Sequence, residues 1–151
     1  MLFEAHLGLG SNLGDRSANI ARGLDSLRHL SRSMKVSSSY ETLPQGFRDQ
    51  PPFLNAACAI WTTLDPFGLM AKIRVIEASL SGTRTFPNAP RALDIDILMH
   101  GRAAVSTPWL KIPFDGLTGI ARLYIQTWDD EATEIYCTPI NIAPDNPAMP
   151  L

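Results

Sequence analysis

At 151 residues, the chain has the length of one domain and can bury about 70% of the surface that its unfolded form exposes. Its 45% hydrophobic and 19% charged residues are typical of a globular protein. The net charge of −2 argues against a nucleic-acid surface, and no apolar run approaches the roughly 18 residues of a membrane span. With two cysteines and no secretory signal at the start, we expect free thiols and a single cytoplasmic domain over residues 1–151.

A short apolar strand over residues 6–10 opens the chain, and glycines stand at positions 8, 10 and 14. These glycines come close to a dinucleotide-binding fingerprint, but the last gap is one residue too long. Glycine within a strand more often marks close approach by another backbone or by a ligand. We therefore expect a close contact at this strand.

Apolar residues at helical spacing predict a helix over 17–30, with Asp15 or Ser17 as its cap. A strand is predicted over 34–42, and the ten-residue loop 43–52 follows it. Loops of this length in compact domains are often functional, with disorder as the alternative interpretation.

Phe53 and Asn55 stand where this loop enters the next predicted strand, 56–63. An asparagine among apolar residues must find hydrogen bonds. A planar heterocycle with donor and acceptor edges would supply them, and so would a neighbouring backbone. Both interpretations stay open from the sequence.

The second helix has the clearest signals: Asp65 as its cap, Pro66 at its first position, and apolar residues at helical spacing up to Leu80. Glu77 falls near the end of this helix, where the helix dipole does not favour a carboxylate. We therefore expect Glu77 to have another role.

The stretch 90–98 contains Asp94 and Asp96 alternating with apolar residues. Successive strand side chains point to opposite faces, so the two carboxylates should project together, and their repulsion favours a bound cation. An ordinary solvent-facing strand is the alternative. By strict alternation Arg91 would lie on the opposite side, unless the turn at Pro90 redirects it.

Three segments, in this order, resemble the 6-hydroxymethyl-7,8-dihydropterin pyrophosphokinase family of folate biosynthesis: Leu9–Asp15 (LGSNLGD), Ser38–Asn55 (SSYETLPQGFRDQPPFLN) and Pro90–Leu98 (PRALDIDIL). The resemblance covers roughly residues 5 to 113. It implies an α+β fold with a ferredoxin-like antiparallel sheet and packed helices in three αβα layers. It also implies an enzyme that uses two Mg²⁺ ions to transfer pyrophosphate from ATP to the pterin hydroxymethyl group, releasing AMP.

The resemblance further implies roles for individual residues. Those implied in catalysis are Arg84, Arg91, Asp94 and Asp96, with the two aspartates as Mg²⁺ ligands and the two arginines as phosphate clamps. Those implied in pterin binding are Thr42, Leu43, Pro44, Gly46, Phe53, Asn55 and Asn88. Those implied in ATP binding are Glu77, Arg84, Arg91, Ile97 and Lys111.

The chain departs from the family pattern at four positions where basic residues are usual: Gly82, Trp109, Phe114 and Ile120. Arg122 would replace the arginine that is missing at Ile120 only if the chain were shifted in register relative to the family pattern. Residues 123–140 are predicted to form a hairpin, and 139–151 a loosely packed tail. Both a working enzyme and a pterin- or nucleotide-binding partner with little transferase activity fit this pattern, and the oligomeric state is not indicated.

Overall fold

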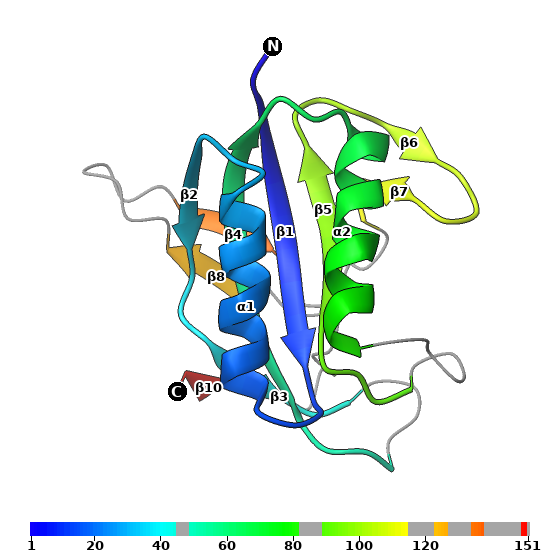
Figure 1. The fold of residues 1–151 in the computed structure, drawn as a ribbon. Helices are drawn as coiled ribbons and strands as arrows, with labels where there is room; N and C mark the ends of the chain where they lie inside the picture. Colours follow the sequence, from blue (N-terminus) through cyan, green and yellow to red (C-terminus); the bar gives the residue numbers. More distant parts are fainter. Residues whose placement is uncertain (45–48, 82–88, 115–122, 127–133, 138–148, 151) are drawn as a thin grey trace.

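The computed structural model describes residues 1–44, 49–81, 89–114, 123–126, 134–137 and 149–150. Within this part of the chain, an antiparallel sheet carries two helices, so the predicted α+β class is confirmed (Figure 1). The helices are α1 (Arg16–Arg28) and α2 (Pro66–Ser81). The strands are β1 (Phe3–Ser11), β2 (Ser33–Val36), β3 (Tyr40–Thr42), β4 (Phe53–Thr62), β5 (Asp94–His100), β6 (Val105–Ser106), β7 (Lys111–Ile112), β8 (Leu123–Gln126), β9 (Glu134–Cys137) and β10 (Met149–Pro150).

The strand order in the main sheet is β10-β3-β4-β1-β5, and β2 also pairs with β4. The strand predicted over 34–42 is therefore two strands, β2 and β3, both against β4. They are separated at Ser37, whose hydroxyl accepts the backbone N–H of Ala57 at 2.9 Å. Such a side-chain bond to a partner strand replaces a regular ladder contact and explains the break.

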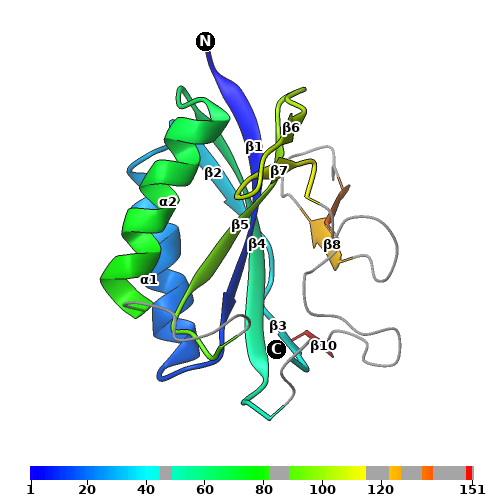
Figure 2. The ribbon, with the colours of Figure 1, turned by 90° about the vertical axis from the view of Figure 1, so that its right-hand side faces the viewer.

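Both helices lie on one face of the sheet, and the segments with β6, β7 and β8 lie on the other (Figure 2). The helix face is the core, and Ile95 and Ile97 of β5 point into it with 3% and 1% exposure. The predicted alternation of β5 is thus confirmed. A helix on the second face, which a three-layer arrangement requires, is not among the residues that the structure describes.

Both predicted helix caps are confirmed. The Asp15 carboxylate accepts the N–H of Ala18 at 3.0 Å, so Asp15 and not Ser17 caps α1. The Asp65 carboxylate accepts the N–H of Gly68 at 2.6 Å at the start of α2. Local sequence signals therefore fixed where both helices begin.

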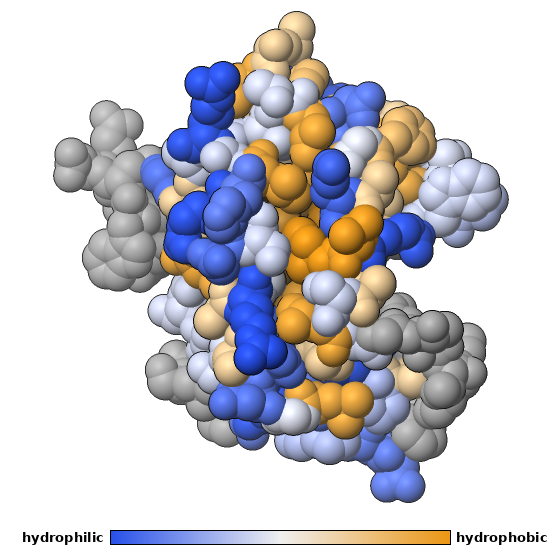
Figure 3. Space-filling model, in the orientation of Figure 1, coloured by the Kyte–Doolittle hydropathy of each residue, from blue (hydrophilic) through white to orange (hydrophobic). Residues whose placement is uncertain are grey.

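The predicted hairpin corresponds to β8 paired antiparallel with β9, and its turn lies outside the described residues. Of the predicted tail 139–151, the structure describes only β10, which pairs with β3. No helix in the described ranges is long and apolar enough to cross a membrane. Figure 3 shows apolar side chains gathered over α2, where Phe67 and Val75 are exposed, beside a hydrophilic α1.

Candidate active site

Several of the predicted site residues that the structure describes lie at the end of the sheet where β1 ends and where β4 and β5 begin. Gly10 of β1 lies opposite Asn55 of β4 on one side and Asp94 of β5 on the other. Directly paired residues in an antiparallel sheet project to the same face. The sheet register therefore places a predicted pterin residue and a predicted metal ligand side by side, on the face without helices.

Because Gly10 has no side chain, neighbouring side chains occupy the space beside it. A Cβ at this position would lie 3.1 Å from Asn55 Oδ1 and 3.3 Å from Phe53 Cδ1. Both distances are tighter than ordinary van der Waals contact, so only glycine fits without displacing these side chains. A close approach is therefore present at Gly10, but the approaching groups are side chains and not the backbone or ligand that the sequence predicted.

On the side predicted to bind the pterin, here called the pterin side, the polar groups of Thr42 and Asn55 are buried and hydrogen-bonded to each other. The Asn55 amide donates to the Thr42 hydroxyl at 2.5 Å, and both residues are nearly inaccessible. Among the residues that the structure describes, the acceptor of the Asn55 amide is thus a side chain. Phe53 and Pro44 are also buried, whereas Leu43 is 54% exposed. This part of the site is neutral and preformed.

On the side predicted to bind the phosphates, here called the phosphate side, Arg91 and Asp94 form an ion pair. An Arg91 guanidinium nitrogen lies 3.2 Å from Asp94 Oδ2, with the two side chains 7% and 12% exposed. Strict alternation does not apply to Arg91, because β5 begins only at Asp94 and Arg91 precedes it, so the exception that the sequence left open holds. The guanidinium carbon also lies 5.1 Å from the centre of the Phe53 ring, within the range of a cation–π contact. Arg91 therefore touches both sides of the site.

The carboxylates suit Mg²⁺ bound together with a phosphate. Asp94 and Asp96 lie two residues apart on β5 and both are partly buried. Among the described residues there is no group of three or more acidic, histidine or cysteine ligands. Mg²⁺ is commonly held by one or two carboxylates, with water and substrate phosphates completing its octahedron. The donor set therefore fits the predicted metal.

Glu77 connects α2 to the aspartate strand. Its carboxylate accepts the backbone N–H of Ile95 at 2.8 Å, on the edge of β5 that faces away from β1. This bond explains a carboxylate near the end of a helix. Ile97 is buried in the core, so only its backbone is placed to meet a nucleotide. Lys111 is exposed on β7.

Several predicted residues lie outside the described ranges. They are Gly46, Gly82, Arg84, Asn88, Ile120 and Arg122. Two further positions where the family usually has a basic residue, Trp109 and Phe114, are described. Trp109 is 65% exposed. The backbone N–H of Phe114 donates to the carbonyl of Leu98 at 2.9 Å. The backbone at Phe114 thus packs along β5 although the basic side chain is absent.

Sequence reasoning assigned no role to Asn12, which lies between the two sides. It is 2% exposed, and its side chain bonds Gln50, Pro51 and Arg91. Its sequence signal was a polar residue directly after a buried strand, a position where an amide must find partners.

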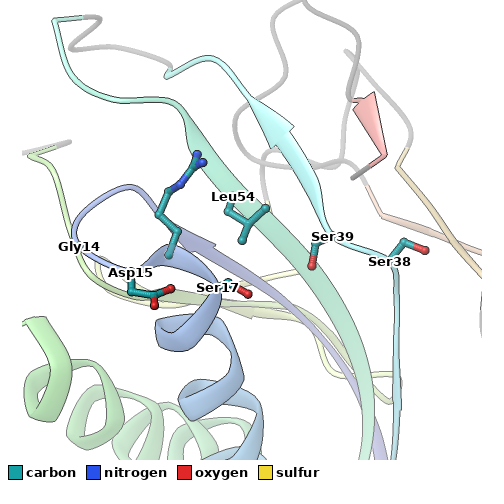
Figure 4. A pocket seen from close by; sticks show the side chains of 7 residues that line it. Gly14, Asp15, Ser17, Ser38, Ser39 and Leu54 are labelled. Carbon is teal, nitrogen blue, oxygen red and sulfur yellow. The ribbon is translucent and has the colours of Figure 1, made fainter.

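A cavity of about 630 Å³ lies near this site but opens on the other face of the sheet (Figure 4). It is lined by Gly14, Asp15, Arg16, Ser17, Ser38, Ser39 and Leu54. Leu54 packs against Ile20 of α1, on the helix face. The cavity is therefore separate from the carboxylates.

Residues 6–125 match the family described as 7,8-dihydro-6-hydroxymethylpterin-pyrophosphokinase. The 2-amino-4-hydroxy-6-hydroxymethyldihydropteridine pyrophosphokinase of Methylorubrum extorquens is 43% identical over 112 residues, which cover 73% of this chain and 71% of that protein. Its Bacillus subtilis counterpart is 41% identical, with 72% and 66% covered.

The folic acid synthesis protein FOL1 of Dictyostelium discoideum is 39% identical over 111 residues, which cover 72% of this chain but only 16% of that longer protein. The family match extends beyond residue 113 to residue 125, into the region where the chain departs from the usual motifs. From these matches and the arrangement of the site, the chain belongs to the 7,8-dihydro-6-hydroxymethylpterin-pyrophosphokinase family.

Proposed function

We propose that this protein transfers pyrophosphate from ATP to the hydroxymethyl group of 6-hydroxymethyl-7,8-dihydropterin, releasing AMP, as a step of folate biosynthesis. The observation that carries the proposal is the placement of Asn55 and Asp94 on either side of Gly10. This register brings the polar side chain of Asn55 and the nearby aromatic ring of Phe53 next to two carboxylates. A heterocycle and a metal-bound phosphate chain would meet at this point.

The pterin would bind where neutral groups are already ordered. Phe53 offers an aromatic surface, and the Thr42–Asn55 pair offers amide and hydroxyl groups to a polar ring edge. Leu43, Pro44, Gly46 and Asn88 would complete this pocket. Because Thr42 and Asn55 hold each other in place, little ordering is needed when the pterin binds.

The triphosphate would bind at Asp94 and Asp96 with two Mg²⁺ ions, which would offset its charge and help orient it. Arg91 and Arg84 would clamp the phosphates through charge-assisted hydrogen bonds. The hydroxymethyl oxygen would attack the β-phosphorus while the bond to the α-phosphate oxygen breaks and AMP leaves. Positioning and charge stabilisation supply most of the rate in such transfers.

The nucleotide would lie along the outer edge of β5. Glu77 already holds this edge through Ile95, and the Ile97 backbone and Lys111 would make further contacts. We also propose that residues 1–151 form one cytoplasmic domain with a ferredoxin-like sheet. The element order β1-α1-β2/β3-β4-α2-β5 and the sheet order β3-β4-β1-β5 support this fold. The third layer stays a prediction.

A coupled assay for AMP release tests the activity. It contains the protein, ATP, Mg²⁺ and 6-hydroxymethyl-7,8-dihydropterin, with parallel reactions that lack the pterin. We expect AMP to form only when all components are present. If AMP release does not exceed the background while calorimetry still detects pterin binding, the proposed transferase activity is contradicted. The protein would then be a pterin-binding protein.

A further inference from the structure

Arg16, the first residue of α1, contacts two strands of the sheet from the helix face. Asp15 caps this helix, so the backbone that carries Arg16 is fixed at its start. The Nη1 group of Arg16 donates to the carbonyl of Pro52 at 3.0 Å, and the Nη2 group donates to Glu41 Oε2 at 2.9 Å. The two charged side chains are partly buried, with 31% and 37% exposed. One side chain of α1 thus reaches both β3 and the residue before β4.

These two contacts lie beside the last residue pair between β3 and β4. Thr42 ends β3 and lies opposite Phe53, which begins β4. Glu41 directly precedes Thr42, and Pro52 directly precedes Phe53. The strand β3 is three residues long, and within the described ranges its other neighbour is β10, which has two residues. Because the ends of short strands open easily, contacts from outside the ladder matter for holding this pair in place.

Arg16 and the pterin side lie on opposite faces of these two strands. Successive residues of a strand point to opposite faces. Glu41 therefore points to the helix face, together with its register partner Leu54, which packs against α1. Thr42 points to the other face, where its hydroxyl accepts the Asn55 amide. The Arg16 contacts thus support the pterin side from behind, through the backbone of β3 and β4.

We infer that Arg16 is a positioning residue for the pterin, which fixes Thr42 and Phe53 through the residues that precede them; this inference rests on the proposed function. A guanidinium suits this role because its planar fork donates in two directions at once, whereas an ammonium acts as a point charge. The strand order places β4 and β1 between β3 and the carboxylates of β5. Loss of the Arg16 contacts should therefore weaken pterin binding and leave nucleotide binding almost unchanged.

Three variants and one control separate this role from a general contribution to stability. Arg16→Ala removes both contacts, Arg16→Lys keeps the charge without the fork, and Glu41→Gln keeps the length of the side chain without its charge. The control is Arg28→Ala. Arg28 is also an arginine of α1 with an ion pair, but its partner Asp25 lies on the same helix at 3.6 Å. This substitution therefore removes an arginine of α1 without removing a contact to β3 or β4.

The test is calorimetry on the full chain, in which 6-hydroxymethyl-7,8-dihydropterin is titrated into protein saturated with Mg²⁺ and a non-hydrolysable ATP analogue. The analogue is also titrated alone, and the melting temperature of every variant is measured. We expect Arg16→Ala to raise the Kd for the pterin about fivefold, which corresponds to the upper end of what a partly exposed ion pair contributes. Arg16→Lys and Glu41→Gln should each raise it about twofold, because they keep part of the contact. The Kd for the analogue should stay the same in all variants, and Arg28→Ala should change neither Kd.

AMP release gives a second readout, in which the variants should raise the KM for the pterin and leave kcat and the KM for ATP unchanged. Arg16→Lys and Glu41→Gln keep the test informative if Arg16→Ala does not fold. A lower melting temperature with an unchanged pterin Kd in the folded variants would overturn the inference, and so would equal losses of pterin and nucleotide affinity. A wild type that binds pterin but releases no AMP would overturn the proposed transferase activity, while the pterin Kd of the variants still decides the inference. A wild type that binds no pterin would overturn both.

Discussion

The two sides of the site are held together by different forces. On the pterin side, a neutral hydrogen bond joins Thr42 and Asn55 beside the buried Phe53. On the phosphate side, Arg91 and Asp94 form an ion pair with 7% and 12% exposure. A neutral buried pair is satisfied whether or not a ligand is present, whereas a buried charge always needs a compensating charge.

This difference separates binding from turnover. The pterin side is preformed, so substitutions there should change the affinity for one ligand and little else. The phosphate side combines two carboxylates with a guanidinium, so a substitution there changes the charge balance of the protein as well as its chemistry. We therefore expect the largest effects from the charged residues, on both turnover and stability.

Asp96→Ala should have the largest effect. We expect turnover to fall by roughly 10²-fold or more, because the phosphate loses the charge compensation that the carboxylate would provide through Mg²⁺. The fold should persist, and the melting temperature without metal should stay the same or rise, because one of two repelling carboxylates is removed. AMP release and thermal melting measure the two effects.

Asp25→Ala is the control for this change. Asp25 is an exposed aspartate on α1, where it pairs with Arg28 at 3.6 Å. It should leave AMP release unaltered. Full turnover in Asp96→Ala would show that the carboxylate pair is not the metal site.

Arg91→Ala should have the next largest effect, in this case on stability. Removing one partner of a buried ion pair leaves an uncompensated charge, and we expect the free energy of unfolding to fall by about 3 kcal/mol. Arg28→Ala removes an ion pair of the same i,i+3 spacing at 62% and 68% exposure, and should cost less than about 1 kcal/mol. Urea unfolding compares the two variants, and equal losses would contradict the difference in burial.

Much of the fold followed from local signals in the sequence. Asp65 was predicted as a cap and Asp15 as one of two candidate caps, and both accept a backbone N–H at the start of their helix. The alternation around Asp94 and Asp96 predicted which face of β5 enters the core, and Ile95 and Ile97 confirm it by their burial. Capping and strand alternation depend on neighbours within a few residues, so a sequence can carry them.

The missed features depend on contacts between distant residues. The position of Arg91 follows from where β5 begins and from the bond that its backbone makes to Asn12, 79 residues earlier. The break between β2 and β3 follows from the bond between Ser37 and Ala57. Periodicity does not encode such pairings, because they exist only once the strands have met. Contacts between distant segments therefore determine the features that the sequence alone did not predict.

Gly10→Ala should weaken pterin binding by about tenfold, because its Cβ would push on Asn55 and Phe53, which have little room to move in a close-packed site. Nucleotide affinity should change much less. Gly23→Ala is the control on the other face: its Cβ would lie 2.9 Å from a Leu93 methyl group, in the core. It should lower stability without changing pterin affinity, and calorimetry with thermal melting distinguishes the two outcomes.

Thr42→Val should have the smallest effect and isolates one hydrogen bond. Valine has nearly the shape of threonine but cannot accept the Asn55 amide, which donates to the Thr42 hydroxyl in the structure. A neutral hydrogen bond contributes about 1 kcal/mol, so we expect pterin to bind roughly fivefold more weakly. Thr42→Ser keeps the hydroxyl and should bind pterin almost as well as the wild type. If serine weakens binding and valine does not, the methyl group and not the hydroxyl positions Asn55, and the pterin side is held by packing rather than by its hydrogen bond.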